Sequence, residues 1–305
     1  MSRRAKICLG IGLFTLLVVA LGVIFGSHGM NTEYQPQNEF KLDPWIKLKL
    51  GPIDMSINKA VLYLFMAAAL TVGTMVYIAR RMTEKPNKVQ TAVEVIYGLM
   101  RDNIAGPDNI DSKLAVKWFP FIGALFLFIW YSNLLGYIPL PVNSEETFNV
   151  FGAHIPAFQI YAATANISVT LMLTLLVWGS YQVEGVRAKG PGAYVKGWLP
   201  GGLENVPAKF VLIPLIFSIE VISQFVRIIS LSVRLFANIL AGHLLILFMG
   251  GGLVILLGLA ALGAVTLPVA VVFFLFEIVL IATLQAFIFA TLTAIYLGGA
   301  VAESH

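Results

Sequence analysis

A small set of polar and ionisable side chains lies inside the most apolar third of this chain. Arg234 stands in the run Ser230-Leu-Ser-Val-Arg-Leu-Phe-Ala-Asn238, between aliphatic neighbours. A guanidinium keeps its charge at any ordinary pH, and placing it at bilayer depth costs about 2.5–3.5 kcal/mol on insertion scales. Charges of this kind mark ion pathways or binding sites in membrane proteins. We therefore expect Arg234 to be a functional residue.

The spacing of these side chains places several of them on one helix face. Glu220, Arg227 and Arg234 recur every seven residues, which is almost two complete turns at 100° per residue. Ser230 and Asn238 lie four residues on either side of Arg234 and share its stripe. An otherwise apolar helix thus carries a polar edge. The complete polar set of this region is Glu220, Gln224, Arg227, Ser230, Ser232, Arg234, Asn238, His243, Glu277 and Gln285.

Structural roles compete with functional ones at most of these positions. Ser230 and Ser232 could simply hydrogen-bond backbone or neighbouring helices. Gln224 and Arg227 could be interfacial or ion-paired, Arg227 with Glu220. Glu220 and Glu277 could each belong to a structural pair or be a protonated, hydrogen-bonded acid. His243 could be a histidine whose hydrogen bonds are satisfied between helices.

Arg234 differs from the others because no carboxylate lies three or four residues away in the sequence. A neighbouring acid on its own helix therefore cannot neutralise it. We expect its counter-charge to come from elsewhere, such as another subunit.

The composition identifies a polytopic membrane protein. The chain has 305 residues, of which 58% are hydrophobic and 12% charged, against about 25% charged in soluble domains. Its net charge of +4 gives no indication of nucleic-acid binding. The single cysteine excludes an internal disulfide, and the four histidines lack metal-ligand spacing, so we expect no metal site and no cofactor.

The apolar runs predict five to six transmembrane helices in an all-α fold. Residues 7–26 form either a retained first span or a signal peptide, and residues 27–58 an extracytoplasmic segment, followed by a membrane domain over 59–305. An amphipathic helix is predicted at the membrane surface over about 89–104. Further spans are predicted at about 60–79, 117–138 and 160–180.

The basic residues predict the topology. The N-terminus, residues 80–88 and a Gly/Pro-rich basic loop at 187–209 carry most of the Lys and Arg, whereas 138–159 carries none. By the positive-inside rule the basic side is cytoplasmic. Three lysines between 27 and 58 count against this assignment.

The C-terminal third predicts two long helices. Residues 207–249 show no turn signal after Pro214 and would form a helix of about 65 Å, against a hydrocarbon core of about 30 Å. A steeply tilted helix or two spans with a hidden turn would fit. Gly250–Gly252 breaks the pattern, and a second apolar run over 253–298 is interrupted near Pro268. We prefer a tilted hairpin.

The arginine motif resembles a known family. Ser230-Leu-Ser-Val-Arg-Leu-Phe-Ala-Asn-Ile-Leu-Ala-Gly-His243 is similar to the signature of subunit a of F-type ATP synthases. The resemblance extends over roughly 55–305. It includes Gln90-Thr-Ala-Val-Glu94, Ser132-Asn133-Leu-Leu-Gly136, Ala165-Asn166-Ile-Ser-Val-Thr170, Leu284-Gln-Ala-Phe-Ile-Phe289 and Leu292-Thr-Ala-Ile-Tyr296.

This resemblance implies a non-catalytic, proton-translocating stator subunit. It implies two half-channels facing a ring of c subunits, with Arg234 as the essential arginine. Glu220 is implied in the cytoplasmic path, and Asn238 and His243 in the outer path. Gln285 is implied to face the arginine helix, and Glu277 to work beside His243, with Asn133 and Asn166 as further polar positions.

The implied setting is a bacterial plasma membrane with a cytoplasmic C-terminus. The implied partners are the c ring, the b-subunit peripheral stalk, membrane lipids and, indirectly, the F1 catalytic sector. No phosphate-binding loop is present in the sequence.

Two departures from the family pattern matter. Glu277 precedes Gln285 by eight residues rather than seven, so either a π-bulge restores its register or Glu277 faces elsewhere. Gly136 and Asn166 stand where some members carry an acid, so an outer-channel carboxylate is expected to be missing there. Two alternatives to the stator subunit are a secondary transporter with an arginine-containing site and a structural scaffold. Transporters often contain internal repeats, and we find none in this sequence, which counts against the first alternative.

Overall fold

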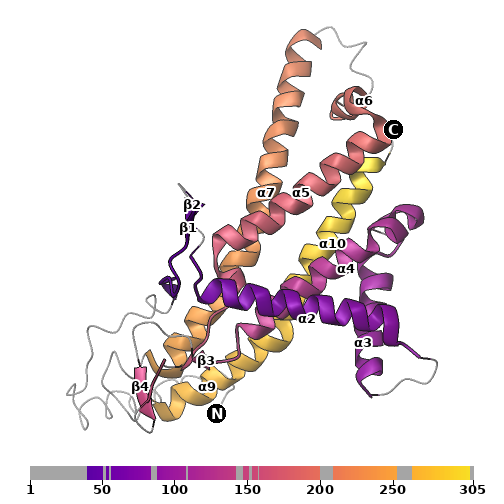
Figure 1. The fold of residues 1–305 in the computed structure, drawn as a ribbon. Helices are drawn as coiled ribbons and strands as arrows, with labels where there is room; N and C mark the ends of the chain where they lie inside the picture. Colours follow the sequence, from indigo (N-terminus) through magenta and orange to yellow (C-terminus); the bar gives the residue numbers. More distant parts are fainter. Residues whose placement is uncertain are drawn as a thin grey trace, which may run out of the picture.

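The fold is a bundle of long helices with short β-hairpins at one end (Figure 1). The computed structural model describes residues 40–50, 53–54, 56–83, 88–107, 109–141, 147–150, 153–156, 158–199, 209–252 and 263–302. The predicted first span at 7–26 and half of the 27–58 segment lie outside these residues. Within them, five helices are long and apolar enough to cross a membrane. The predicted class, an all-α polytopic membrane protein, is confirmed.

The helices follow one another with short breaks. They are α2 (Lys59–Arg81), α3 (Lys88–Gly98), the π-helix η2 (Leu99–Ile104), α4 (Ser112–Leu135), the 3-10 helix η3 (Ala163–Ala165), α5 (Ile167–Lys189), α6 (Pro191–Lys196), α7 (Lys209–Leu247), the π-helix η5 (Phe248–Gly252), α9 (Gly263–Phe276), the π-helix η7 (Glu277–Ile281) and α10 (Ala282–Val301).

Three antiparallel pairs of short strands lie in the loops. They are β1 (Lys49–Leu50) with β2 (Ile53–Asp54), β3 (Leu140–Pro141) with β6 (Phe158–Gln159), and β4 (Thr147–Val150) with β5 (Ala153–Pro156). The loop predicted at 138–159 therefore contains hairpin structure.

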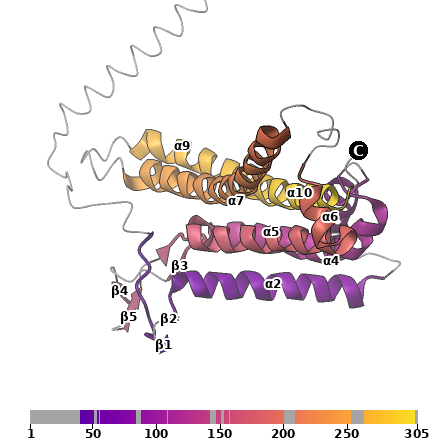
Figure 2. The ribbon, with the colours of Figure 1, turned by 90° about the horizontal axis from the view of Figure 1, so that it is seen from above.

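The helices form layers, with α2 on one side, α4 and α5 in the middle and α7 with α9 and α10 on the other (Figure 2). A seam of small residues lets α10 approach its neighbours closely. Ala282, Ala286, Ala290 and Ala294 are fully buried at intervals of four residues. The seam continues to Gly298, where a Cβ would meet the backbone oxygen of Asn109. Small side chains at this spacing are typical of close helix packing in membranes.

The prediction of one uninterrupted long helix is confirmed. Helix α7 runs through 39 residues without a turn, and its geometry changes only at the glycine triplet, which lies in η5. Helix α9 returns alongside it, and the two run in opposite directions (Figure 1). The steep tilt relative to a membrane stays a prediction.

The predicted bounds of the fourth span and of the basic loop after it were wrong. The fourth span begins at Ile167, not 160, because the Asn166 side chain caps α5 by accepting from the Ser168 N–H at 2.9 Å. It continues to Lys189 and ends at Gly190, which has a φ of 82°. The predicted basic loop thus includes the last turn of α5 and the helix α6.

Pro268 does not interrupt the last helix. It lies in the second turn of α9, where it removes one intrahelical hydrogen bond without breaking the helix. The irregularity of this segment is the π-helix η7 instead.

Candidate functional site

Arg234 points away from the core of its own chain. On α7, Leu231, Leu235 and Ile239 are buried against the bundle, whereas Arg234 is exposed. Ser230 and Asn238 are exposed on the same face. Among the described residues no carboxylate forms an ion pair with Arg234. Arg234 therefore lacks a counter-charge on its own helix, as expected, and also on the other described elements.

The polar edge of α7 divides into two parts. Glu220 and Arg227 are half-buried toward α5 and α10, whereas Arg234 is exposed. The seven-residue repeat falls short of two full turns by about 20° per repeat, so the side chains drift around the helix. This drift turns the first two residues toward the bundle and the third away from it.

Glu220 is held in a hydrogen-bonded group between α7 and α5. Gln224 is buried and donates to Glu220 Oε1 at 3.0 Å, while its own Oε1 accepts from the Tyr181 hydroxyl at 2.8 Å. The Arg227 guanidinium lies 3.7 Å from Glu220 Oε1. The ion pair that the sequence left open as an alternative is therefore present, although both side chains are partly exposed.

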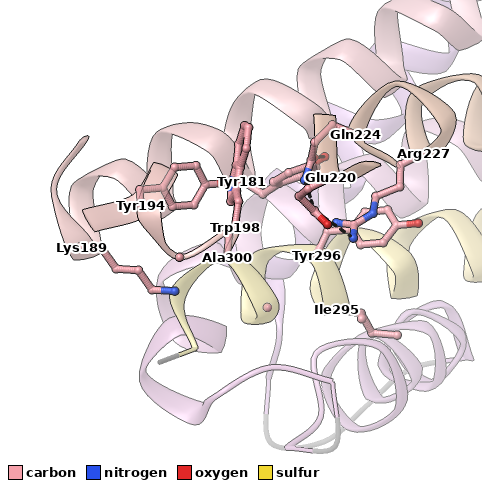
Figure 3. Close-up of a pocket in the computed structure, with 12 residues that line it drawn as sticks. Tyr181, Lys189, Tyr194, Trp198, Glu220, Gln224, Arg227, Ile295, Tyr296 and Ala300 are labelled. Atoms are coloured by element: carbon pink, nitrogen blue, oxygen red, sulfur yellow. Dashed lines mark hydrogen bonds and ion pairs between the residues drawn. The ribbon is translucent and has the colours of Figure 1, made fainter. Parts of the chain in front are cut away.

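A pocket of about 440 Å³ opens beside this group (Figure 3). Arg227 stacks over the Tyr296 ring at 5.6 Å, and Tyr194 and Trp198 of the α6 region form the opposite wall. Burial raises the pKa of the Tyr194 phenol, so it stays neutral near pH 7. Glu220 is the carboxylate that lines the pocket. Lys189 donates to the carbonyl of Ala302 at its rim.

A second polar cluster lies toward the other end of α7. His243 is buried, with Nε2 3.1 Å from the Gly136 carbonyl oxygen and Nδ1 3.0 Å from that of Ile239. The Tyr137 ring contacts the His243 ring at a tilt of 35°, with centroids 4.6 Å apart. Its hydroxyl donates to Glu277 Oε2 at 2.9 Å. Tyr137 therefore bridges the two ionisable groups.

The π-helix η7 begins at Glu277 and ends before Gln285. The π-bulge that was one of two alternatives for the eight-residue spacing is therefore present. Glu277 is buried against α7, where a Cβ at Gly242 would collide with its carboxylate. The structure thus brings Glu277 next to Gly242, which directly precedes His243.

The remaining predicted residues have mostly structural contacts. Asn133 donates to the Ala282 carbonyl at 3.2 Å and accepts from Thr164 at 2.6 Å, which joins α4 to α10 and η3. Asn166 caps α5. Ser232 donates within its own helix to Ile229. Gln285 is buried on α10. Asn238 is exposed and does not join the His243 cluster, because five residues correspond to a rotation of 140°.

Sequence reasoning missed the aromatic members of both polar regions. Tyr137 directly follows the quoted Ser132–Gly136 segment, Tyr181 lies just beyond the span predicted at about 160–180, and Tyr296 was quoted only as the last residue of a family segment. An aromatic residue at such positions is an ordinary anchor or core residue, so its type gave no signal. Lys117 and Glu184 were also missed; they pair across α4 and α5. Among the described residues no group of His, Cys, Asp and Glu could hold a metal ion.

Arg234 lies between the two polar regions along α7. At 1.5 Å per residue it is about 21 Å from Glu220 and about 14 Å from His243. Over residues 61–298 the sequence matches the family described as ATP synthase A chain. The chain belongs to the ATP synthase A chain family. The matched range contains Arg234 and both polar regions.

Similar proteins of this family carry the name ATP synthase subunit a. That of Rubrobacter xylanophilus is 37% identical over 252 residues, covering 83% of this chain and 87% of that protein. That of Hyphomonas neptunium is 31% identical over 277 residues, covering 88% and 97%. ATP synthase subunit a 1 of Brucella anthropi is 30% identical over 276 residues, covering 88% and 98%. The chain thus spans most of the length of these relatives.

Proposed function

We propose that this chain is the proton-translocating stator subunit of an F-type ATP synthase membrane sector. The observation that carries the proposal is the position of Arg234, an exposed cation on α7 without an ion pair in the described chain, between two polar regions. Its counter-ion is a carboxylate of a partner, the c-subunit ring. The ring passes the exposed face of α7, and each of its carboxylates meets Arg234 in turn.

The arginine acts by changing the charge state of the ring carboxylate. A carboxylate facing lipid favours its neutral form because charge is poorly solvated there. Beside a permanent cation the ionised form becomes favourable, so the carboxylate releases its proton near Arg234 and takes one up after it has left. The same cation repels protons and blocks direct leakage between the two regions.

The two polar regions serve as half-channels to opposite sides. The Glu220 pocket opens at the end of the bundle that carries Lys189 and α6, which the positive-inside rule assigns to the cytoplasm. The cluster of Glu277, Tyr137 and His243 serves the outer side, and Asn238 lies between it and Arg234. Each proton that moves across 100 mV supplies about 2.3 kcal/mol to rotation.

The proposed setting follows from the family and the topology. The chain lies in a bacterial plasma membrane with a cytoplasmic C-terminus, contacts the b-subunit peripheral stalk and lipids, and is not itself a catalytic subunit. ATP is made in the F1 sector, which this chain serves through the ring. Nothing in the described residues favours a secondary transporter over this role.

The test is ATP-driven proton pumping by the assembled complex in inverted membrane vesicles. Arg234→Ala is expected to abolish pumping, and Arg234→Lys to leave at most a small part, since a lysine can lose its charge when buried. Arg187→Ala, which removes an exposed cation from the last turn of α5, is the matched control and should pump normally. Normal pumping by the Arg234→Ala complex would refute the proposal.

A further inference from the structure

Tyr137 touches three other elements at the outer cluster. It directly follows the turn at Gly136 that ends α4, and its side chain is almost fully buried. The ring lies over His243 of α7 and edge-on to Phe274 of α9, with centroids 5.8 Å apart in the second pair. Its hydroxyl reaches Glu277 at the start of η7. Its position is therefore fixed by packing on several sides.

His243 is placed between acceptors. Both of its ring nitrogens lie at hydrogen-bond distance from carbonyl oxygens, those of Gly136 and Ile239. A neutral imidazole has one N–H donor, so both contacts are satisfied together only when both nitrogens carry protons. The face of the Tyr137 ring provides a further favourable contact for a cationic imidazolium. Each ring nitrogen of His243 therefore has a backbone acceptor within reach.

One of the two carboxylate oxygens of Glu277 is hydrogen-bonded to Tyr137. Its Oε2 accepts from the Tyr137 hydroxyl, and within the described residues its Oε1 has no hydrogen-bond donor. Gly242 leaves room for the carboxylate against α7. The tyrosine thus leaves Oε1 as the oxygen that exchanges a proton. Among the described residues, Glu277 and His243 are the ionisable groups in contact with Tyr137.

We propose that Tyr137 is a positioning residue of the outer half-channel that couples Glu277 to His243. Its hydroxyl fixes the carboxylate, and its ring fixes the imidazole, so that the two proton-accepting groups keep a constant relative position. Tyr137 also follows Gly136, a position where the sequence lacks an acid, and brings a buried hydroxyl to the outer cluster. This inference rests on the proposed function.

The experiment measures passive proton conduction through the assembled membrane sector in vesicles stripped of F1. Tyr137→Phe keeps the ring on His243 and removes the donor to Glu277. We expect a decrease of roughly tenfold, the size expected for losing one hydrogen bond to a charged group. Tyr131→Phe is the matched control. It removes a hydroxyl that bonds Thr74 on α2, 2.8 Å away and outside the cluster, and conduction should be unchanged.

A double-variant comparison separates positioning from general structural damage. Glu277→Asp keeps an acid but shortens it beyond the reach of the Tyr137 hydroxyl, so adding Tyr137→Phe to it should cause no further loss. Full additivity of the two changes, or conduction by Tyr137→Phe equal to that of Tyr131→Phe, would overturn the inference. The amount of assembled complex is measured alongside. Normal pumping by Arg234→Ala would refute the function itself, which is a separate outcome.

Discussion

At the residue scale, the decisive contrast is between Arg234 and the charges that are paired within the described chain. Glu220 and Arg227 pair with each other, and Lys117 pairs with the buried Glu184. Arg234 has no ion pair within the described chain and faces outward among exposed apolar neighbours. At membrane depth such a cation costs about 2.5–3.5 kcal/mol on insertion scales. A partner carboxylate would offset this cost, and this is why we assign Arg234 to a protein interface.

A second feature of this scale is the close fit of Gly242 to the Glu277 carboxylate. Gly242→Ala would place a methyl group where the carboxylate lies. We expect it to displace Glu277 from Tyr137 and to destabilise the bundle by about 1–3 kcal/mol through overpacking. Proton pumping per assembled complex should fall. Gly179→Ala on α5 is the control because a Cβ there meets no atom within 4 Å, and equal pumping by both variants would contradict the assigned contact.

At the scale of elements, the π-helix η7 explains how an eight-residue spacing is accommodated. One extra residue in a helix rotates everything before it by 100°, and a π-turn absorbs this residue. Glu277 and Gln285 are consequently both buried. The extra residue is thus accommodated locally, and α10 keeps its alanine seam against α4.

A π-turn that absorbs one residue predicts the effect of a deletion. Removing Ile278 from η7 should convert the π-turn to α-helix and keep Glu277 beside Gly242, so the complex should assemble and retain pumping. Removing Ile288 from α10, where no π-turn can absorb the change, should rotate the helix and abolish assembly. Western blots of the assembled complex and pumping assays distinguish these outcomes. Equal loss in both deletions would show that η7 does not act as a register adjustment.

The sequence predicted elements better than contacts. The length and apolarity of the spans determined their number within the described residues, and the lack of a turn between Gln224 and Leu235 predicted one continuous α7. The start of α5 was predicted at about 160 because the apolar run does not reveal the side-chain contact by which Asn166 caps the helix. Tyr137 was missed because its role depends on three elements that only the fold brings together.

At the scale of the whole molecule, one side of the bundle is unpartnered. Helix α7 has the smallest buried share of the five candidate spans, with 6% of its apolar window buried. Its exposed apolar side chains run from Phe210, 84% exposed, through Phe225, 62% exposed, and exposure continues at Phe248 of η5, 39% exposed. Apolar exposure along the full length indicates that lipid or a partner covers the outward face of the helix from end to end.

The length of α7 predicts its orientation in the membrane. A helix of 39 residues is about 58 Å long, and it fits a core of about 30 Å only if its axis leans on the order of 60° from the membrane normal. Spin labels at Phe210 and at Leu245 should therefore be accessible to oxygen in the lipid phase. Labels at Arg187 should report water. A label at Phe210 or Leu245 that is accessible mainly to a water-soluble relaxation agent would contradict the tilt.

The central claim is that the exposed face of α7 presents Arg234 to a carboxylate of another subunit. An experimental structure of this chain within its assembled membrane complex tests it most directly. We predict that a ring of partner helices lies along α7 and that one of their carboxylates comes within about 4–6 Å of the Arg234 guanidinium, the distance over which an opposite charge stabilises an ionised acid. An Arg234 side chain that faces only lipid, or that pairs with a carboxylate of its own chain, would contradict the claim.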